Sequence, residues 1–401
     1  MKHLTKDEWE RKYIARPIER MDQKNIGFNR ARWDEQTLIG EKTFREWGKK
    51  LYGLVMPSDK PGDTLQDFSF KNAAWYLEFG FGFGNAKGQQ GLYAWDSTQI
   101  GVSRAPQGLK IDAADPPQIT RDIKKVATYF GADLVGVTRR DERWIYTDYY
   151  DLRDRKYGPV QIPEDCKYVI AMAFEMDHEL IKYSPAQVTD AAPGMGYSKM
   201  AFTTGLLAQF IRGIGYKAIP CGNDTAMSTP IALQAGLGEL GRNGLLITPE
   251  YGPRVRLSKV FTDLPLASDE PIEFGVTEFC QQCNKCAHNC PSQAIMYGER
   301  TTKSHNISNV SGELKWPVDA ERCFSFWARH SGPCSNCLRV CPFNKDMNWF
   351  HKTSRWFVDN IRWADPLYRK LDDLFGYGKQ KKADNFWDEW KPRQALRTTR
   401  G

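Results

Sequence analysis

The ten cysteines of this chain are distributed very unevenly. Eight lie between Cys280 and Cys341, and only Cys166 and Cys221 lie outside that stretch. Disulfide scaffolds are typical of short secreted proteins, whereas closely spaced Cys-x-x-Cys pairs inside a chain of 401 residues indicate metal ligation. Short spacings and many polar residues leave little room for a conventional core. We therefore expect bound metal to hold this part of the fold together.

Two cysteine motifs supply the expected ligands. The first runs from Cys280 to Pro291 as Cys-x2-Cys-x2-Cys-x3-Cys-Pro, which is the bacterial ferredoxin spacing. The second runs from Cys323 to Pro342 and has a first gap of ten residues, but keeps Cys-x2-Cys-x3-Cys-Pro. In two-cluster ferredoxins the fourth cysteine of a motif ligates the other cluster. The spacing therefore predicts two [4Fe–4S] clusters, one held by Cys280, Cys283, Cys286 and Cys341, the other by Cys290, Cys323, Cys334 and Cys337.

Zinc is the alternative metal for these cysteines. Paired knuckles would suit a zinc tetrad, but three cysteines at x2 spacing followed by Cys-Pro do not require one. Two clusters in one small module imply the passage of single electrons toward a partner site that the motifs do not identify. A pure iron–sulfur electron-transfer subunit, without chemistry of its own, is therefore one functional hypothesis.

Composition places the chain among globular proteins. Hydrophobic residues make up 41% and charged residues 26%, both ordinary values. No segment approaches the roughly 18 uninterrupted apolar residues that a membrane span requires. The net charge of +7 is small for this length, and local basic runs such as residues 379–382 are more typical of solvated surface. We therefore expect no nucleic-acid partner.

The chain divides into four expected parts. Residues 1–115 are rich in Trp, Phe and Gly, and the tract at residues 79–84 fits neither helix nor strand periodicity, so we expect irregular structure there. Residues 116–268 alternate between helix and strand patterns, as in an α/β or α+β core. Residues 269–350 form the cysteine-rich module. Residues 351–401 combine aromatic and charged residues and are expected to dock as short helices.

Periodicity and breaker residues locate the main elements of residues 116–268. A helix that ends at Gly131 and a long helix with Phe202, Leu206 and Phe210 at every fourth position are the clearest. The long helix is expected to stop at Gly213 and Gly215. The expected segments are a helix over 117–130, strands over 133–137, 167–173 and 216–219, and a helix over 228–235 followed by a strand over 245–248.

Residues 236–241 match the dinucleotide fingerprint G-x-G-x-x-G. A true fingerprint follows a strand and opens a helix, whereas here an expected helix precedes the glycines and an expected strand follows them. The pattern therefore argues against a nicotinamide or flavin site. We expect Gly236, Gly238 and Gly241, together with Asn243, to let the backbone approach another large planar cofactor.

The segment from Gly222 to Ala226, followed by residues 235–256 and the two cysteine motifs, resembles the corrinoid-dependent reductive dehalogenases. The resemblance extends over about residues 117–343. It implies an α+β fold, with a nitroreductase-like corrinoid-binding core and an appended bacterial-ferredoxin-like two-[4Fe–4S] module. It also implies a base-off cobamide that receives electrons from the clusters. The sequence contains no Asp-x-His-x-x-Gly motif, which is consistent with that binding mode.

The resemblance further implies three catalytic residues, which match the family in motif and order: Tyr197, Asn223 and Arg256. Arg254 is an alternative to Arg256, since on a strand both would share one face. Replacing carbon–halogen by carbon–hydrogen consumes two electrons and one proton, and the Tyr197 phenol can supply the proton. A free tyrosine has a pKa of about 10, which a neighbouring arginine would lower.

Three tryptophans are expected to bind the substrate. Trp327 matches a family tryptophan that lines the pocket, and Trp75 and Trp95 are expected to join it from residues 1–115, which would cover the pocket. An organohalide is apolar and polarizable, so aromatic walls can bind it by shape and desolvation.

Besides the electron-transfer subunit, one more rival function and several partners are expected. An epoxyqueuosine reductase-like corrinoid enzyme acting on tRNA is the closest alternative. The family resemblance implies a small organohalide substrate, an upstream electron donor, a small integral-membrane anchor protein and a possible homodimer. It also implies association with the outer face of the cytoplasmic membrane after removal of a leader, with a cytoplasmic location as the alternative.

Overall fold

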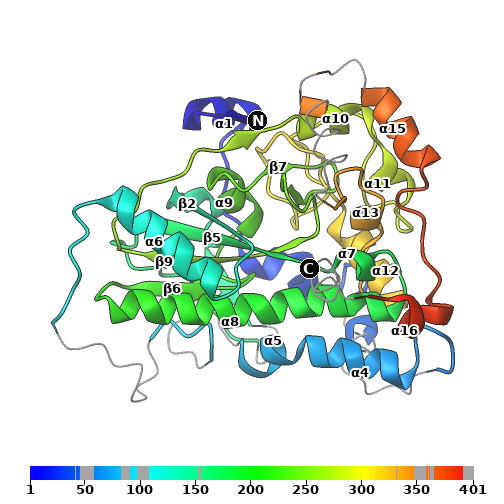
Figure 1. Cartoon of the computed structure of the whole chain (residues 1–401), viewed down its shortest axis with the longest axis horizontal. Helices are drawn as coiled ribbons and strands as arrows, with labels where there is room; N and C mark the ends of the chain where they lie inside the picture. Colours follow the sequence, from blue (N-terminus) through cyan, green and yellow to red (C-terminus); the bar gives the residue numbers. More distant parts are fainter. Residues whose placement is uncertain are drawn as a thin grey trace, which may run out of the picture.

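A four-stranded antiparallel sheet lies at the centre of the chain (Figure 1). Its strands, in spatial order, are β2 (Leu134–Arg139), β5 (Tyr168–Glu175), β9 (Val255–Thr262) and β6 (Ala218–Cys221). This computed structural model describes residues 1–40, 42–45, 58–82, 91–96, 108–151, 155–330, 332–346, 358–359, 361 and 365–391. Among these residues no helix combines the length and the apolar character needed to cross a bilayer.

The central strand β5 contributes residues to the hydrophobic clusters on both faces of the sheet. Val169, Ala171 and Ala173 face one cluster of buried residues, and the alternate positions 170, 172 and 174 face another. Successive side chains of a strand point to opposite faces, so a strand covered on both sides reads as an unbroken apolar run. The strand expected over 167–173 is thus confirmed.

Helices α6 (Pro116–Tyr129) and α8 (Ala191–Gly213) cover one face of the sheet (Figure 1). Asp115 caps α6 by accepting a hydrogen bond from the Gln118 backbone amide, and Pro116 occupies the first turn, where no amide donor is needed. Gly131 follows the helix with φ of 116°. The sequence-based prediction of this helix and its end is confirmed.

The long helix α8 differs from expectation in the face that it buries. Leu207, Ala208 and Ile211 pack toward the sheet, whereas Phe202 is 45% exposed. Both sets of apolar residues recur at helical spacing, and only the position of the sheet determines which set is buried. The helix also begins earlier than its aromatic stripe and contains Gly194 and Gly196, whose missing side chains let other residues approach closely.

The opposite face of the sheet is covered by α9 (Ser228–Gln234) and α1 (Lys6–Tyr13). Trp9 of α1 and Trp144 pack edge to face, and both are buried. Strand β1 (Lys2–His3) pairs with β10 (Ile272–Glu273), so the start of the chain is bound to the segment that precedes the cysteine motifs.

Residues 1–115 contain more helix than expected. Besides α1, the described part holds η1 (Gln23–Asn25), α2 (Gly27–Arg30), α4 (Leu65–Ala74) and α5 (Tyr76–Phe81). Thr64 and Asp67 form a capping box that starts α4. The aromatic–glycine tract is helical up to Phe81, and residues 83–84 lie outside the described residues. The expectation of irregular structure was wrong for α5, because packing against α8 stabilises a helix that local composition disfavours.

Four of the eight motif cysteines lie on short helices, one on each of α10 (Val276–Gln282), α11 (Lys285–His288), α12 (Ala320–His330) and α13 (Asn336–Arg339). The remaining short elements are η3 (Glu142–Trp144), β3 (Asp148–Tyr150), β4 (Tyr157–Pro159), α7 (His178–Ile181), η4 (Gln187–Asp190), β7 (Glu239–Leu240) and β8 (Leu246–Ile247). Cys280, Cys283 and Cys341 pack with Phe279 and Phe343 in one buried cluster.

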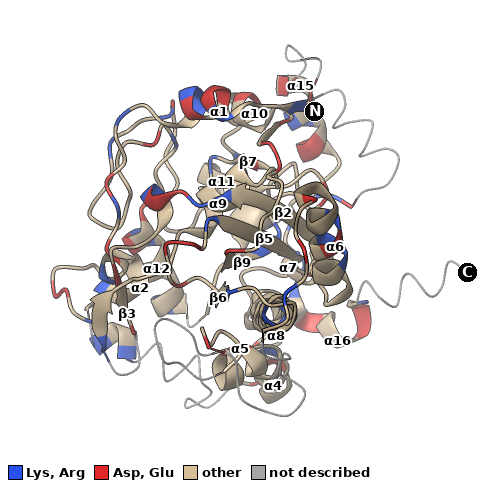
Figure 2. Ribbon diagram, turned by 90° about the vertical axis from the view of Figure 1, so that its left-hand side faces the viewer, with Lys and Arg blue, Asp and Glu red and all other residues tan. Residues whose placement is uncertain are grey.

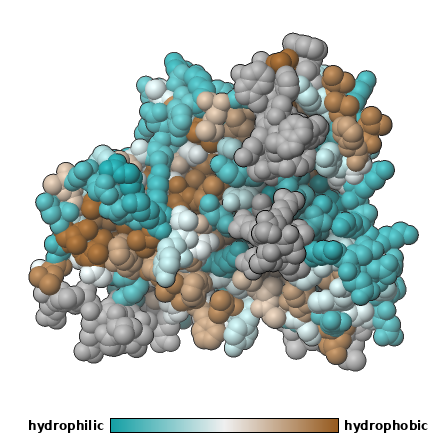
Figure 3. Space-filling model, in the orientation of Figure 1, coloured by the Kyte–Doolittle hydropathy of each residue, from teal (hydrophilic) through white to brown (hydrophobic). Residues whose placement is uncertain are grey.

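The last described residues form α15 (Asp365–Leu374), η6 (Ala383–Asn385) and α16 (Phe386–Glu389). Phe386 is buried and its ring packs edge to face on Tyr183, so short docking helices are found here as expected. Basic and acidic residues are interspersed over the described elements (Figure 2). Hydrophilic side chains cover much of the face shown in Figure 3, interrupted by hydrophobic patches.

Candidate active site and cluster ligands

The side chains of Tyr197, Asn223 and Arg256 meet at one place in the fold. They come from α8, from the loop after β6 and from β9, respectively. The Asn223 amide donates a hydrogen bond of 2.5 Å to the Tyr197 hydroxyl, and the Arg256 guanidinium carbon lies 5.1 Å from the centre of the Tyr197 ring. Asn223 is exposed and Tyr197 is half-buried. Their polar atoms are therefore accessible to a bound molecule.

Arg254 and Arg256 do not share a face. Arg254 precedes β9 and is fully buried, with its guanidinium bound to Glu175 and to the Lys345 carbonyl oxygen. Burial lowers the pKa of Arg254 to about 10. The expectation of a common face was wrong because the strand begins at Val255. Arg254 ties the core to the residues after the last cysteine, and Arg256 faces Tyr197.

Trp75 is the one predicted tryptophan that contacts Tyr197 among the described rings. The two rings stack with centroids 4.8 Å apart, and Phe79 stacks on the other side of Trp75 at 5.0 Å. A Cβ at Gly194 would lie 2.6 Å from the Trp75 ring, so the glycine allows this approach. Trp95 packs with the α9 side of the sheet, and Trp327 packs on Phe28 and Phe324.

Four of the predicted site residues carry a buried nitrogen donor that has no hydrogen-bond partner among the described residues. They are Nε of Arg256 and the indole nitrogens of Trp75, Trp95 and Trp327. Unpaired buried donors are costly and uncommon in native proteins. A corrinoid carries amide side chains whose oxygens accept hydrogen bonds. The donors present here therefore fit such a group.

The loop that presents Asn223 is held by buried charges that sequence reasoning missed. Lys259 of β9 donates to the Gly222 carbonyl oxygen at 2.6 Å and to the Ser228 hydroxyl at 3.0 Å. The Asp224 carboxylate accepts a hydrogen bond from the Gly222 amide at 2.7 Å. Burial raises the pKa of Asp224 and lowers that of Lys259, and each counteracts the other's shift. Nothing in the local spacing of these residues signals their pairing.

The glycines of residues 236–241 approach the chain itself. An added Cβ would lie 2.5 Å from the Glu270 carbonyl oxygen at Gly236 and 2.1 Å from the Ile247 carbonyl oxygen at Gly238. At Gly241 it would meet Asn243, whose side chain accepts a hydrogen bond from the Leu245 amide. Gly236 and Gly238 thus lie just before β7, and Gly241 and Asn243 lie in the turn that joins β7 and β8. Close packing of the chain on itself requires glycine at these positions; the expected approach to a cofactor stays a prediction.

The structure groups the eight cysteines of the two motifs into two sets. Cys280 lies within electrostatic range of Cys283, Cys286 and Cys341, and Cys337 lies within range of Cys290, Cys323 and Cys334 and also of Cys286 from the first set. No cysteine forms a disulfide. Burial raises the pKa of the Cys286 and Cys323 thiols to about 12, so they would ionise readily only when a metal binds them.

Arg242 braces the first motif. Its guanidinium donates to the carbonyl oxygens of Cys280, at 2.7 Å, and Cys283, at 3.0 Å, and lies over the Trp316 ring. Only 1% of Arg242 is exposed. Arg242 directly follows the glycines of residues 236–241. This segment therefore contacts the cysteine module as well as the core.

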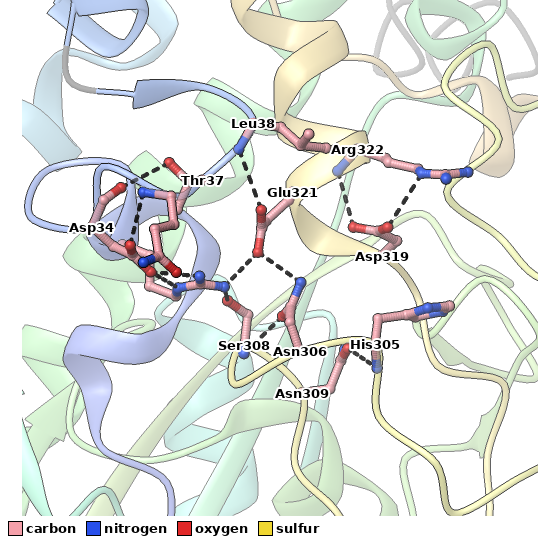
Figure 4. A network of polar contacts seen from close by, with 12 residues as sticks. Asp34, Thr37, Leu38, His305, Asn306, Ser308, Asn309, Asp319, Glu321 and Arg322 are labelled. Atoms are coloured by element: carbon pink, nitrogen blue, oxygen red, sulfur yellow. Dashed lines mark hydrogen bonds and ion pairs between the residues drawn. The ribbon is translucent and has the colours of Figure 1, made fainter.

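Helix α12, which carries Cys323 and Trp327, is anchored to the beginning of the chain (Figure 4). The Glu321 carboxylate pairs with Arg30 and accepts hydrogen bonds from the Leu38 amide and the Asn306 side chain. Arg322 points the other way, toward Asp319 (Figure 4). On the core side, the Ser184 hydroxyl donates to Asn336 of α13. The second cysteine set is therefore held between two distant parts of the chain.

Comparisons with known proteins agree with this arrangement. A family model described as a reductive dehalogenase subunit matches residues 144–266, and one described as a 4Fe–4S dicluster domain matches residues 279–345. The chain is 36% identical to a tetrachloroethene reductive dehalogenase of Sulfurospirillum multivorans over 370 residues, which cover 84% of this chain and 73% of the relative. It is 36% identical to a tetrachloroethene reductive dehalogenase of Desulfitobacterium hafniense, with 81% and 70% covered.

The fold matches a catabolic reductive dehalogenase solved in complex with 3-bromo-4-hydroxybenzoic acid. The TM-score is 0.74 at 24% identity, and the match covers 94% of this chain but 49% of the other. The chain thus spans about half the length of that solved protein. An epoxyqueuosine reductase of Lactococcus garvieae is 29% identical over 133 residues, 29% of this chain. From its match to the curated relatives, the chain belongs to the reductive dehalogenases, oxidoreductases that act on carbon–halogen bonds.

Proposed function

We propose that this chain replaces the halogen of a small organohalide by hydrogen, with release of halide. The observation that carries the proposal is the contact of Asn223 and Arg256 with Tyr197. The reaction takes two electrons and one proton, and the Tyr197 hydroxyl is the proton donor. Arg256 lies over the ring, and Asn223 donates a hydrogen bond to the hydroxyl and orients it.

A cobamide, when bound, supplies the low-potential cobalt centre that accepts single electrons and cleaves the carbon–halogen bond. Among the predicted site residues with unpaired donors, Arg256, Trp95 and Trp327 would hold it. The two cysteine sets would hold [4Fe–4S] clusters that deliver the electrons. The stacked rings of Trp75 and Phe79 offer an apolar wall to the substrate beside Tyr197.

A chlorinated ethene is the substrate class that we propose to assay first. Two relatives that are each 36% identical to this chain carry tetrachloroethene in their names. An aromatic wall would bind such an uncharged molecule by dispersion and desolvation. A halogenated phenol is the comparison substrate, because the solved relative contains 3-bromo-4-hydroxybenzoic acid.

The test is an anaerobic assay of protein reconstituted with iron, sulfide and a cobamide. We expect halide release from tetrachloroethene, together with bound cobalt and about eight irons per chain. Iron without cobalt and without halide release would instead support the electron-transfer subunit. Reduction of an epoxyqueuosine-containing tRNA without halide release would support the reductase that acts on tRNA.

We further propose an upstream electron donor, a small integral-membrane anchor protein and a location at the outer face of the cytoplasmic membrane. The support for the anchor and the location is the family resemblance alone. Fractionation of cells that make this protein, followed by immunodetection in membrane and soluble fractions, tests the location. Recovery in the soluble cytoplasm would exclude it.

A further inference from the structure

Arg242 is a buried cation beside the first cysteine motif, and all of its hydrogen-bond acceptors are uncharged. Only 1% of the residue is exposed. Its guanidinium carbon lies 4.6 Å from the centre of the Trp316 ring. Its guanidinium nitrogens donate at 2.7–3.4 Å to the backbone carbonyl oxygens of Cys280, Gln281, Cys283, Met296 and Gly298. These contacts satisfy the donors of Arg242 but do not balance its positive charge.

Two lysines near the same motif do have carboxylate partners. Lys285 pairs with Asp372 and Asp373, and Lys345 pairs with Asp372. Arg242 forms no ion pair with a carboxylate in the part of the chain that the structure describes. A buried charge is costly unless an opposite charge faces it. Arg242 therefore needs an anion that these side chains do not supply.

The cluster that the first set of cysteines would hold is such an anion. A [4Fe–4S] core with four thiolate ligands is negatively charged, and reduction makes it more so. Arg242 donates to the backbone of Cys280 and Cys283, two of the four residues that would hold it. A positive charge close to the cluster in a buried, poorly screened environment favours the reduced state. Surrounding charge and hydrogen bonds are what a protein uses to adjust the potential of such clusters.

We propose that Arg242 sets the reduction potential of the first cluster, the one held by Cys280, Cys283, Cys286 and Cys341, and that its buried charge raises this potential. The cluster takes one electron from a low-potential one-electron donor and passes one electron on, while Arg242 stays protonated throughout. The inference rests on the proposed [4Fe–4S] clusters and does not depend on the halide chemistry. Arg242 acts through the cluster and does not touch the substrate.

A purely structural role for Arg242 makes a different prediction. Cys280, Gln281 and Cys283 lie at the C-terminal end of α10, where carbonyl oxygens lack partners within the helix. A side chain with N–H donors satisfies such oxygens whether or not it is charged. If Arg242 only braces this helix end, removal of its charge alone should leave the potential of the cluster unchanged.

The test is a potentiometric titration monitored by electron paramagnetic resonance, in protein loaded with iron, sulfide and a cobamide. Cys341→Ala removes a ligand of the first cluster and thereby identifies its signal. Arg242→Gln keeps N–H donors without the charge, and Arg242→Lys keeps the charge. We expect Arg242→Gln to change the one-electron equilibrium constant of the first cluster at least tenfold, which lowers its midpoint potential by about 59 mV or more. Arg242→Lys should stay within about threefold of the wild type in that constant.

Two controls accompany these variants. The second cluster should keep its potential in both, which makes it an internal reference. Arg212→Gln is the matched substitution, because Arg212 also donates to backbone carbonyl oxygens, those of Ala94, Trp95 and Ala218, none of which belongs to a cysteine motif. It should leave both potentials unchanged.

An unchanged first-cluster potential in Arg242→Gln, or equal shifts in Arg242→Gln and Arg242→Lys, would overturn the proposal. If Arg242→Gln does not assemble the first cluster, Arg242→Lys decides, because a near-wild-type potential supports the role of the charge and a clear drop contradicts it. Loss of the first cluster in both variants would assign Arg242 a structural role and also overturn the proposal. Protein that shows both cluster signals but releases no halide would overturn the proposed function, yet the potentials would still decide the role of Arg242.

Discussion

The ammonium group of Lys259 donates a hydrogen bond of 2.6 Å to the carbonyl oxygen of Gly222, the residue before Asn223. Both ends of this contact are buried. It connects β9, which also carries Arg256, to the loop that presents Asn223. A single strand thereby positions two of the three residues that meet at the candidate active site.

Substituting Lys259→Met should lower kcat and destabilise the fold. The substitution removes the hydrogen bonds from Lys259 to the buried Gly222 carbonyl oxygen and to the Ser228 hydroxyl, and leaving a buried acceptor unsatisfied costs about 1–3 kcal/mol. Urea unfolding and halide release measure the two effects. Lys217→Met, which removes an exposed lysine near the same strand, is the matched control. Equal behaviour of the two variants would show that the Lys259 contact does not position the loop.

Substituting Tyr197→Phe should lower kcat by about 100-fold or more, which is the usual contribution of a general acid. The ring remains to stack on Trp75, so cofactor content and unfolding should change little. Tyr183→Phe, at a buried tyrosine whose hydroxyl has no partner among the described residues, should retain activity. Undiminished turnover of loaded Tyr197→Phe would exclude this residue as the proton donor.

The two cysteine sets predict which cluster each substitution removes. Cys341→Ala lies in the second motif but should abolish the cluster of the first, because Cys341 faces Cys283 and Cys286. Iron content should fall to about four per chain, and electron paramagnetic resonance of the reduced protein should keep only the other cluster's signal. Cys290→Ala should give the reciprocal result. Loss of the same signal in both variants would contradict the crossed pairing.

Asp190 is a buried carboxylate immediately before α8, and burial raises its pKa. The free energy of unfolding should therefore depend on pH. In the folded chain the pKa is about 6, against an ordinary value of 3.8, so between these values the folded state binds the additional proton. The contribution of Asp190 to the free energy of unfolding should therefore fall as pH rises from about 4 to about 6, by about 3 kcal/mol in all. Urea unfolding of the wild type and of Asp190→Asn over this range checks the sign. Parallel curves would show that Asp190 does not titrate there.

Local sequence patterns were sufficient to predict the two cysteine motifs and several helices and strands. Cysteine spacing indicates which thiols can share a metal because the short segments between ligands allow few geometries. Pro117 near the start and the stop at Gly131 located α6, since a helix end is set by residues within one turn of it. The resemblance to a family supplied Tyr197, Asn223 and Arg256, which the fold then places together.

Tertiary structure decided what local patterns leave open. Periodicity marks two possible stripes on α8, and the position of the sheet selects the one with Leu207 and Ile211. The hydrogen bond from Lys259 to the loop at Gly222 joins residues far apart in the chain. Which charges share a buried, poorly screened environment depends on how whole elements pack, because burial determines both the cost of a charge and the strength of its partner.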